Sequence, residues 1–300
     1  MIVPSEGSDQ LPPSPSAHDL RASTEAARLV GCRVYSIPQD FSVCETAKNA
    51  LWHIPCQEQL TPAAWIGYIP SSEHYSALYQ AALDKNMRLL NSPEEHQTAQ
   101  EFDRAYPYLV GLTPESVTVS SVGECVLAAE IIGLPAFVKG AVQSRKARGW
   151  KACVAETVPE LEFLVRQLLS LEERSRGRVI VRRLVKLRAS RSSAEGFPFG
   201  REYRVFVYNE QIIGLGYYWE GDDPLRALTG DEEQKVRALA LDAARRLAVP
   251  YTAIDIGQTE DREWIVIESG DGQFSGVSQV PLLSLWHNLR STVHSGIITP

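Results

Sequence analysis

The sequence predicts an α+β protein in which two antiparallel sheets, each with its own helices, follow a smaller α/β domain. Three observations lead to this fold class. Short apolar runs typical of strands recur along the chain, amphipathic segments with helix-capping signals lie between them, and two pairs of strand runs are joined by short turns. The chain has 300 residues, which is enough for one large domain or two of moderate size.

The first part of the chain is predicted to hold a leader and the α/β domain. Residues 1–27, with prolines and serines between Leu11 and Ser16, are expected to be a disordered leader. The α/β domain is expected to cover residues 28–112. Its elements are predicted in the order strand, strand, helix, strand, at residues 33–37, 64–70, 75–82 and 87–90.

A strong helix start follows these strands. Ser92 is a capping residue, Pro93 stands at the first helical position, and Glu95 completes a capping box. We therefore predict a helix from this point to about Tyr106.

Residues 113–296 are predicted to hold the two antiparallel sheets. Strands are expected at residues 117–119, 137–139, 179–181, 202–208, 211–216, 251–256 and 263–268. Helices are expected at residues 123–132, with Gly133 as the stop, and after the capping residues Thr157 and Thr229.

Composition narrows the classes of function. The formal net charge of −7 gives no overall basic surface, which disfavours nucleic acid as a partner. No apolar run approaches the roughly 20 residues that span a bilayer, so no membrane partner is expected. The N-terminus lacks a signal-peptide pattern, and the five cysteines are scattered, so we expect a cytoplasmic protein with reduced thiols.

A lysine at the end of a predicted strand is the first candidate for a functional residue. Lys139 closes an apolar run and is followed by glycine, so the strand fixes the stem of a compact positive charge that suits a phosphate. The next turn, residues 144–151, carries four cations, among them Arg145 and Lys146, and is suited to folding over a triphosphate. The alternative is a solvated basic loop.

Acidic residues gather on the last predicted hairpin. Asp255 and Glu268 end its two strands, and a hairpin brings such positions side by side. Two neighbouring carboxylates repel each other unless a cation or a shared proton lies between them, and Mg²⁺ with nucleotide phosphates is the usual solution. Asp271 is a candidate third ligand or a supporting group. The alternative is that Asp255 caps a turn and Glu268 faces solvent.

Two further segments place charges between these groups. Strand alternation puts Glu202 and Arg204 on one face, where Arg204 is suited to neutralising a transferring phosphoryl group. A cross-strand ion pair is the alternative explanation for this pattern. Arg182 and Arg183 follow a buried strand run, where an arginine is unusual unless it meets an anion, and the backbone here is also suited to binding an adenine edge.

The order of these parts resembles the ATP-grasp superfamily over about residues 114–275. The resemblance is greatest to a bacterial and phage clade in which two arginines join the lysine. The segments that carry it are Pro135-Ala136-Phe137-Val138-Lys139, Ser144-Arg145-Lys146, Arg201-Glu202-Tyr203-Arg204-Val205-Phe206-Val207 and Ile267-Glu268-Ser269-Gly270-Asp271-Gly272. The helix start at residues 91–96 also resembles the N-terminal domain of that clade.

The resemblance implies an ATP-grasp fold, with two α+β lobes that clamp ATP behind the α/β domain. It implies that Lys139 holds the α-phosphate, that Lys146 holds the β/γ end and that Arg204 contacts the γ-phosphate or an acyl-phosphate. Asp255 and Glu268 are the implied Mg²⁺ ligands. The remaining residues expected to bind the nucleotide are Arg145, Arg183 and Glu202.

One position departs from the family pattern. Family members usually carry asparagine two residues after the metal-binding glutamate, where this chain has Gly270. The resemblance implies an ATP-dependent ligase that joins a carboxylate to an amine through an acyl-phosphate, with a small molecule or peptide as substrate. Two alternatives remain: an inactive ATP-binding module, which Gly270 would explain, and an enzyme that modifies the ends of proteins or nucleic acids.

Overall fold

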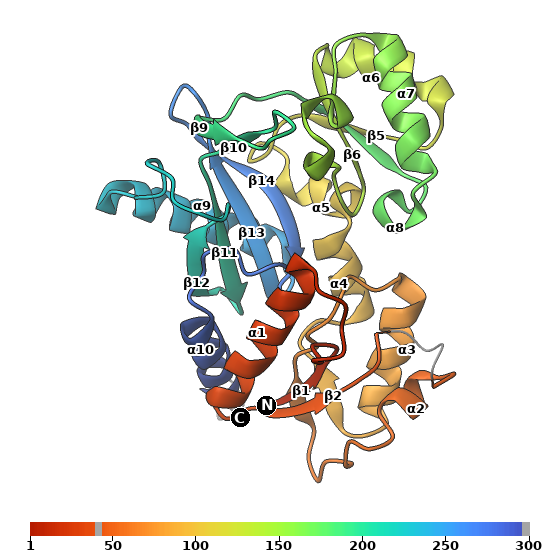
Figure 1. Cartoon of the computed structure of the whole chain (residues 1–300), viewed down its shortest axis with the longest axis vertical. Helices are drawn as coiled ribbons and strands as arrows, with labels where there is room; N and C mark the ends of the chain where they lie inside the picture. The colour runs from red at the N-terminus through yellow and green to blue at the C-terminus, as the bar shows by residue number, and fades with distance from the viewer. Residues whose placement is uncertain (40–43, 296–300) are drawn as a thin grey trace.

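The computed structural model describes residues 1–39 and 44–295. The molecule is elongated: a parallel sheet with its helices lies at one end, the helices α6 and α7 lie at the other, and a second antiparallel sheet lies between them (Figure 1). Within the described residues, no helix has the length and apolar character needed to cross a membrane.

The N-terminal unit is built on a four-stranded parallel sheet of order β2-β1-β3-β4. Its strands are β1 (Ile2–Ser5), β2 (Arg33–Ser36), β3 (Thr61–Ala63) and β4 (Met87–Leu89). Its helices are α1 (Pro15–Leu29), α2 (Ala47–Ala50) and α3 (Ser72–Leu83). The predicted α/β character of this unit is confirmed. The strand predicted at residues 64–70 is wrong in position, because the paired segment starts at Thr61 and residue 66 makes only an isolated bridge to β1.

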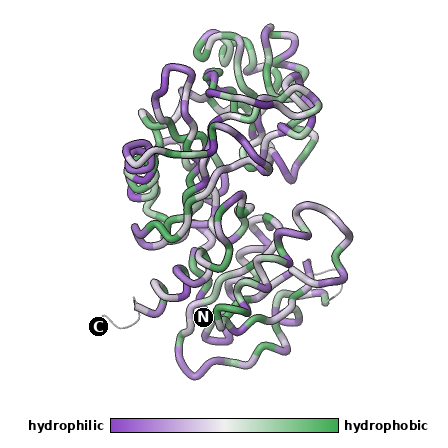
Figure 2. Tube along the Cα trace, turned by 60° about the vertical axis from the view of Figure 1, so that its left-hand side comes forward, coloured by the Kyte–Doolittle hydropathy of each residue, from purple (hydrophilic) through white to green (hydrophobic). Residues whose placement is uncertain are grey.

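The prediction of a disordered leader over residues 1–27 is wrong. These residues form β1, which lies between β2 and β3 in the sheet, and most of α1. Ile2 and Val3 are completely buried, and the trace beside the N-terminus is hydrophobic (Figure 2). Ser14 caps α1 by accepting a hydrogen bond from the Ala17 backbone. A strand of four residues adds little to overall composition, so composition misses an element that a central place in the sheet makes indispensable.

The capping box at Ser92 is confirmed, but the helix behind it is shorter than predicted. Helix α4 (Pro93–Gln100) ends at Glu101, where the backbone is extended, and α5 (Phe102–Leu109) begins directly after it. The Glu101 carboxylate is buried and accepts hydrogen bonds from Arg104, Arg176 and Arg178. These long-range partners hold the break, and local helix signals contain no trace of them.

The first lobe holds an antiparallel sheet of order β5-β8-β6-β7. Its strands are β5 (Ser116–Val119), β6 (Ala136–Gly140), β7 (Val154–Ala155) and β8 (Val179–Arg183). Its helices are α6 (Cys125–Ile132), α7 (Val158–Leu169), α8 (Glu172–Ser175) and the short 3-10 turns η1 (Val122–Glu124), η2 (Lys146–Arg148) and η3 (Trp150–Ala152). Apolar side chains of α6 and α7 pack on one face of the sheet, which leaves the other face available to the second lobe.

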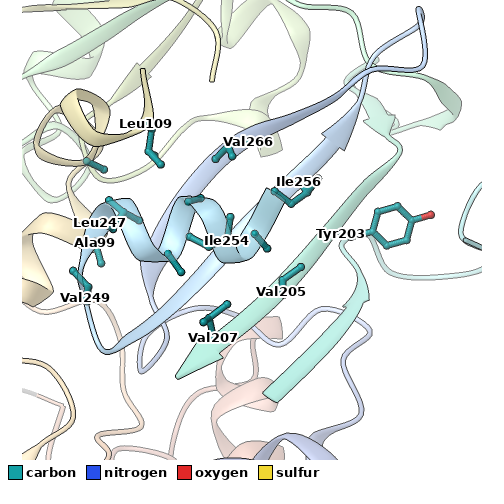
Figure 3. Close-up of a cluster of buried hydrophobic side chains, with 14 of the residues drawn as sticks. Ala99, Leu109, Tyr203, Val205, Val207, Leu247, Val249, Ile254, Ile256 and Val266 are labelled. Carbon is teal, nitrogen blue, oxygen red and sulfur yellow. The ribbon is translucent and has the colours of Figure 1, made fainter. Parts of the chain in front are cut away.

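The second lobe holds the antiparallel sheet β12-β11-β13-β14. Its strands are β11 (Glu202–Tyr208), β12 (Gln211–Tyr217), β13 (Tyr251–Gln258) and β14 (Trp264–Asp271), and the hairpin of β9 (Ala189–Ser192) and β10 (Pro198–Gly200) precedes them. Helix α9 (Gly230–Leu247) packs its apolar stripe on this sheet, as Figure 3 shows. Helix α10 (Leu282–Ser295) contacts both α1 and β12. The prediction of two antiparallel sheets is confirmed.

The corrected start of the chain gives a direct prediction. We expect Ile2→Ala to lower the free energy of unfolding by about 2–5 kcal/mol, because it removes a completely buried side chain from β1. Leu29→Ala is the matched control, since Leu29 is 67% exposed at the end of α1, and its effect should stay within about 0.5 kcal/mol. Denaturant unfolding of both variants measures the difference. Equal, small effects would mean that residues 1–27 contribute nothing to the folded state.

Candidate functional site

Three charged residues lie in register across neighbouring strands of the second lobe. Arg204 on β11 is opposite Asp255 on β13, and Asp255 is opposite Glu268 on β14. Residues directly opposite each other point to the same face of a sheet. The hairpin therefore brings the two predicted carboxylates side by side and places Arg204 in the same row.

Arg204 and Asp255 form a two-pronged ion pair. Arg204 donates from Nε to Oδ1 and from Nη2 to Oδ2, each at 2.8 Å, and from Nη1 to the Gly276 carbonyl at 2.6 Å. Burial disfavours the charged guanidinium, but the attraction of Asp255 outweighs burial and raises the pKa of Arg204. The cross-strand ion pair considered from the sequence is therefore present, at the predicted position.

Lys139 reaches the same row from the first lobe. Its side chain is almost completely buried, and its ammonium donates a short hydrogen bond to Glu268 Oε1. Burial lowers the pKa of Lys139, and Glu268 offsets part of that effect. Burial would raise the pKa of Glu268, but the attraction of Lys139 and Lys146 is stronger and holds it below its usual value. The ion pair thus joins β6 to β14 across the two lobes.

Lys146 lies in an aromatic cage beside a second buried carboxylate. Its Nζ is 3.8 Å from Glu202 Oε2 and lies over the rings of Phe197, Tyr218 and Trp219, at 5.3 to 5.9 Å from their centroids. Burial opposes its charge, but Glu202 outweighs burial and raises the pKa of Lys146. Burial raises the pKa of Glu202, which is 2% exposed. Glu202 Oε2 has no hydrogen-bond partner within the described residues.

A cavity of about 390 Å³ runs between the lobes beside these charges. One part of its wall is apolar and the other is charged. The apolar part includes Phe137, Trp150, Leu184, Phe197, Ile265 and Ile267, and the charged part includes Lys139, Lys146, Arg182, Glu202 and Glu268. This size is within the roughly 300–1,000 Å³ that is usual for small-molecule sites. A ligand with a flat apolar end and an anionic end fits such a wall.

Comparison with known proteins agrees with this geometry. Residues 130–289 match the model of an ATP-grasp domain family, the third of the clade named for two arginines and a lysine. The chain belongs to this ATP-grasp family. No curated protein sequence matches it.

Solved structures share the ATP-grasp fold over nearly the whole chain. A RimK domain protein from Sphaerobacter thermophilus matches at 17% identity, with a TM-score of 0.61 and coverage of 97% of this chain and 98% of that one. The D-alanine–D-alanine ligase from Bacillus anthracis, in complex with ATP, matches at 9% identity, with a TM-score of 0.66 and coverage of 98% and 96%. The ATP-grasp fold expected from the sequence is confirmed.

The ATP-grasp frame contains one buried cation that the predicted nucleotide site does not include. Arg182 on β8 is 5% exposed, donates to the Ser116 hydroxyl and the Ile267 carbonyl, and lies 4.0 Å from the Phe102 ring centroid. Burial lowers its pKa to about 10. Its Nη2 atom is buried without a hydrogen-bond partner among the described residues. Strand alternation from buried Ile180 could have identified Arg182 as the inward arginine.

Two of the predicted nucleotide-binding side chains are engaged elsewhere. Arg183 lines the cavity, but its guanidinium is more than half exposed and donates to Glu115. Arg145 donates to the Gln167 side chain on α7 and does not line the cavity. The structure therefore contradicts a direct role for either side chain in this arrangement, because partners outside the cavity hold both.

Asp271 is wrong as a metal ligand. It stands three positions beyond Glu268 on β14, so its side chain points to the opposite face of the sheet. There it is completely buried, 2.9 Å from His96 Nδ1, and accepts from the Gln273 backbone. Within residues 1–39 and 44–295, no group of three or more His, Cys, Asp or Glu side chains is suited to a metal ion. Asp271 instead binds β14 to α4.

Gly270 is surrounded too closely to be a simple vacancy. A Cβ atom at this position would lie 2.7 Å from the Ser275 hydroxyl, closer than real Cβ atoms approach a neighbour. Ser275 itself donates to the Asp271 carbonyl at 2.9 Å. The space at the usual asparagine position is therefore filled by another segment of this chain.

Proposed function

We propose that this ATP-grasp protein is an ATP-dependent ligase that joins a carboxylate to an amine through an acyl-phosphate. The observation that supports the proposal most strongly is the row of Arg204, Asp255 and Glu268, completed by Lys139 from the opposite lobe. Two cations and two carboxylates lie next to an apolar cavity. Such a set suits a magnesium-bound triphosphate with an aromatic base at its other end.

The cavity wall suggests how ATP lies in it. The adenine ring packs among the apolar and aromatic side chains, and the unpartnered Glu202 Oε2 accepts a hydrogen bond from the nucleoside. Lys139 and Lys146 bind phosphate oxygens as compact charges. Arg182, whose Nη2 lacks a partner among the described residues, donates to the same anionic group.

Asp255 and Glu268 fit Mg²⁺ in the way that nucleotide sites usually hold it. Mg²⁺ in such sites takes one or two carboxylates, with substrate phosphates and water as the other ligands. The two carboxylates are directly opposite on β13 and β14, and each is balanced by a cation that a phosphate would also attract. Bound Mg²⁺ would supply charge neutralisation of the phosphates. Asp271 is not part of this set.

The proposed chemistry has two steps. A carboxylate oxygen of the donor attacks the γ-phosphorus, which forms the acyl-phosphate and releases ADP. The amine nitrogen then attacks the acyl carbon, the C–N bond forms, and phosphate leaves with the electron pair of the broken C–O bond. Arg204 neutralises the charge on the phosphoryl group in both steps, and catalysis rests on positioning and electrostatics.

An ATP-binding module without ligase activity is the second candidate. The crowded backbone at Gly270 favours it, since the side-chain ligand that the family usually places there has no room. Product analysis separates the two candidates.

The proposed reaction predicts its products. With Mg-ATP and a panel of paired carboxylates and amines, we expect ADP and phosphate in equal amounts, and only when both partners of a competent pair are present. Chromatography of the nucleotides gives the measurement. AMP with pyrophosphate would indicate activation by adenylation and contradict the acyl-phosphate route. Tight Mg-ATP binding without turnover of any pair would favour the inactive module.

The phosphate site is tested by a pair of cation variants. Lys139→Ala should weaken ATP binding by about 10- to 150-fold, because a charge-assisted hydrogen bond in a buried cleft is worth about 1.5–3 kcal/mol. Arg148→Ala is the control, since Arg148 is exposed and does not line the nucleotide cavity. Calorimetric titration of ATP into both folded variants decides. Affinities near that of the wild type for both would contradict the placement of the phosphates.

A further inference from the structure

A second cavity, of about 220 Å³, lies where three distant parts of the chain meet. Its wall comes from α1, from the segment after β3, and from the segment after β14. It is therefore distinct from the nucleotide cavity, with which it shares no lining residue in the described part of the chain. It is also smaller than the roughly 300–1,000 Å³ usual for drug-sized ligands, which suits a group the size of an amino acid.

The wall of this cavity has a clear chemical character. Asp19, on α1, is the one charged side chain among the described residues that line it. The other polar groups of the wall are neutral, and they are Ser16, Ser23, Tyr68, Gln143, Gln273 and Ser275. Because these described residues include no lysine or arginine, a carboxylate or phosphate would find no positive partner among them. A cation would find Asp19.

The cavity is adjacent to the proposed reaction centre. Gly276 lines it, and the Gly276 carbonyl accepts a hydrogen bond from Arg204 Nη1. A side chain at position 276 would begin 3.5 Å from Arg204 Nη1 and 3.9 Å from Asp19 Oδ2. Glycine therefore keeps open the space between the carboxylate in this cavity and the guanidinium beside the nucleotide site.

We infer that this second cavity binds the amine substrate, and that Asp19 holds a positively charged group of that substrate. The inference rests on the proposed ligase function and adds the substrate's charge and size. An amine that attacks an acyl-phosphate held at Arg204 must approach from a neighbouring space, and this cavity supplies one. The substrate class is a cationic amine of amino-acid size, or a longer molecule with such an end.

The surroundings of Asp19 agree with an empty place for a cation. Its nearest cationic candidate in the described structure is His18, at 3.9 Å on the surface of the same helix. Partial burial and the repulsion of Glu220 raise the pKa of Asp19, with His18 acting weakly in the opposite direction. A bound ammonium would relieve both the burial cost and the repulsion.

The test uses three small probes of similar size and different charge, namely glycinamide, N-acetylglycinamide and N-acetylglycine. Ligand-detected NMR measures their binding to the full chain, with and without Mg-ATP. We expect the cationic glycinamide to bind most tightly, and Asp19→Asn to weaken it by about three- to tenfold, a range reduced because Asp19 is partly exposed. Asp19→Lys should reverse the order in favour of N-acetylglycine. Glu25→Gln removes the same charge from the surface of α1 and should change nothing.

Two outcomes would overturn the inference. One is equal affinity of glycinamide for the wild type and Asp19→Asn, and the other is preferred binding of the neutral or anionic probe to the wild type. Failure of the ligase proposal appears separately, as absence of Mg-ATP binding in the same samples, because probe binding is also measured without nucleotide.

Discussion

The constraint on which the rest of this structure depends is the burial of opposite charges between two lobes. A buried ion left without a partner costs several kcal/mol, so each cation in the cleft must face a carboxylate. The register of β11, β13 and β14 meets this requirement for Arg204 and Asp255, and Lys139 completes it for Glu268 from the other lobe. The pairs that satisfy the protein without nucleotide are also the groups that Mg-ATP would separate and occupy.

Much of this arrangement can be predicted from local pattern. A hairpin fixes which positions are opposite, so Asp255 and Glu268 can be paired from spacing alone, and an apolar strand can place Lys139. The errors lie where contacts between distant segments decide. Asp271 is close to Glu268 in sequence, which favours a shared metal, yet alternation turns it toward His96. Arg182 faces inward although its neighbour is the predicted ligand, because nothing local marks which arginine meets the cleft.

The start of the chain shows the same limit with a larger consequence. Composition predicts disorder for residues 1–27, whereas they supply a central strand and a helix that α10 packs against. That helix carries Asp19 to the edge of the proposed reaction centre. The N-terminal unit is therefore both a structural partner of the second lobe and one wall of the proposed amine site, and neither role is visible from the residues of α1 alone.

The most direct test of this account is calorimetric titration of ATP into the wild-type protein, with Mg²⁺ and again with a chelator. If phosphates displace carboxylates from Lys139 and Arg204, the displaced carboxylates need Mg²⁺ as a new cation. We therefore predict that removing Mg²⁺ weakens ATP binding by at least about tenfold, or 1.4 kcal/mol. Equal ATP affinity under the two conditions would contradict the exchange of ion pairs, and with it the assignment of Asp255 and Glu268 to the metal.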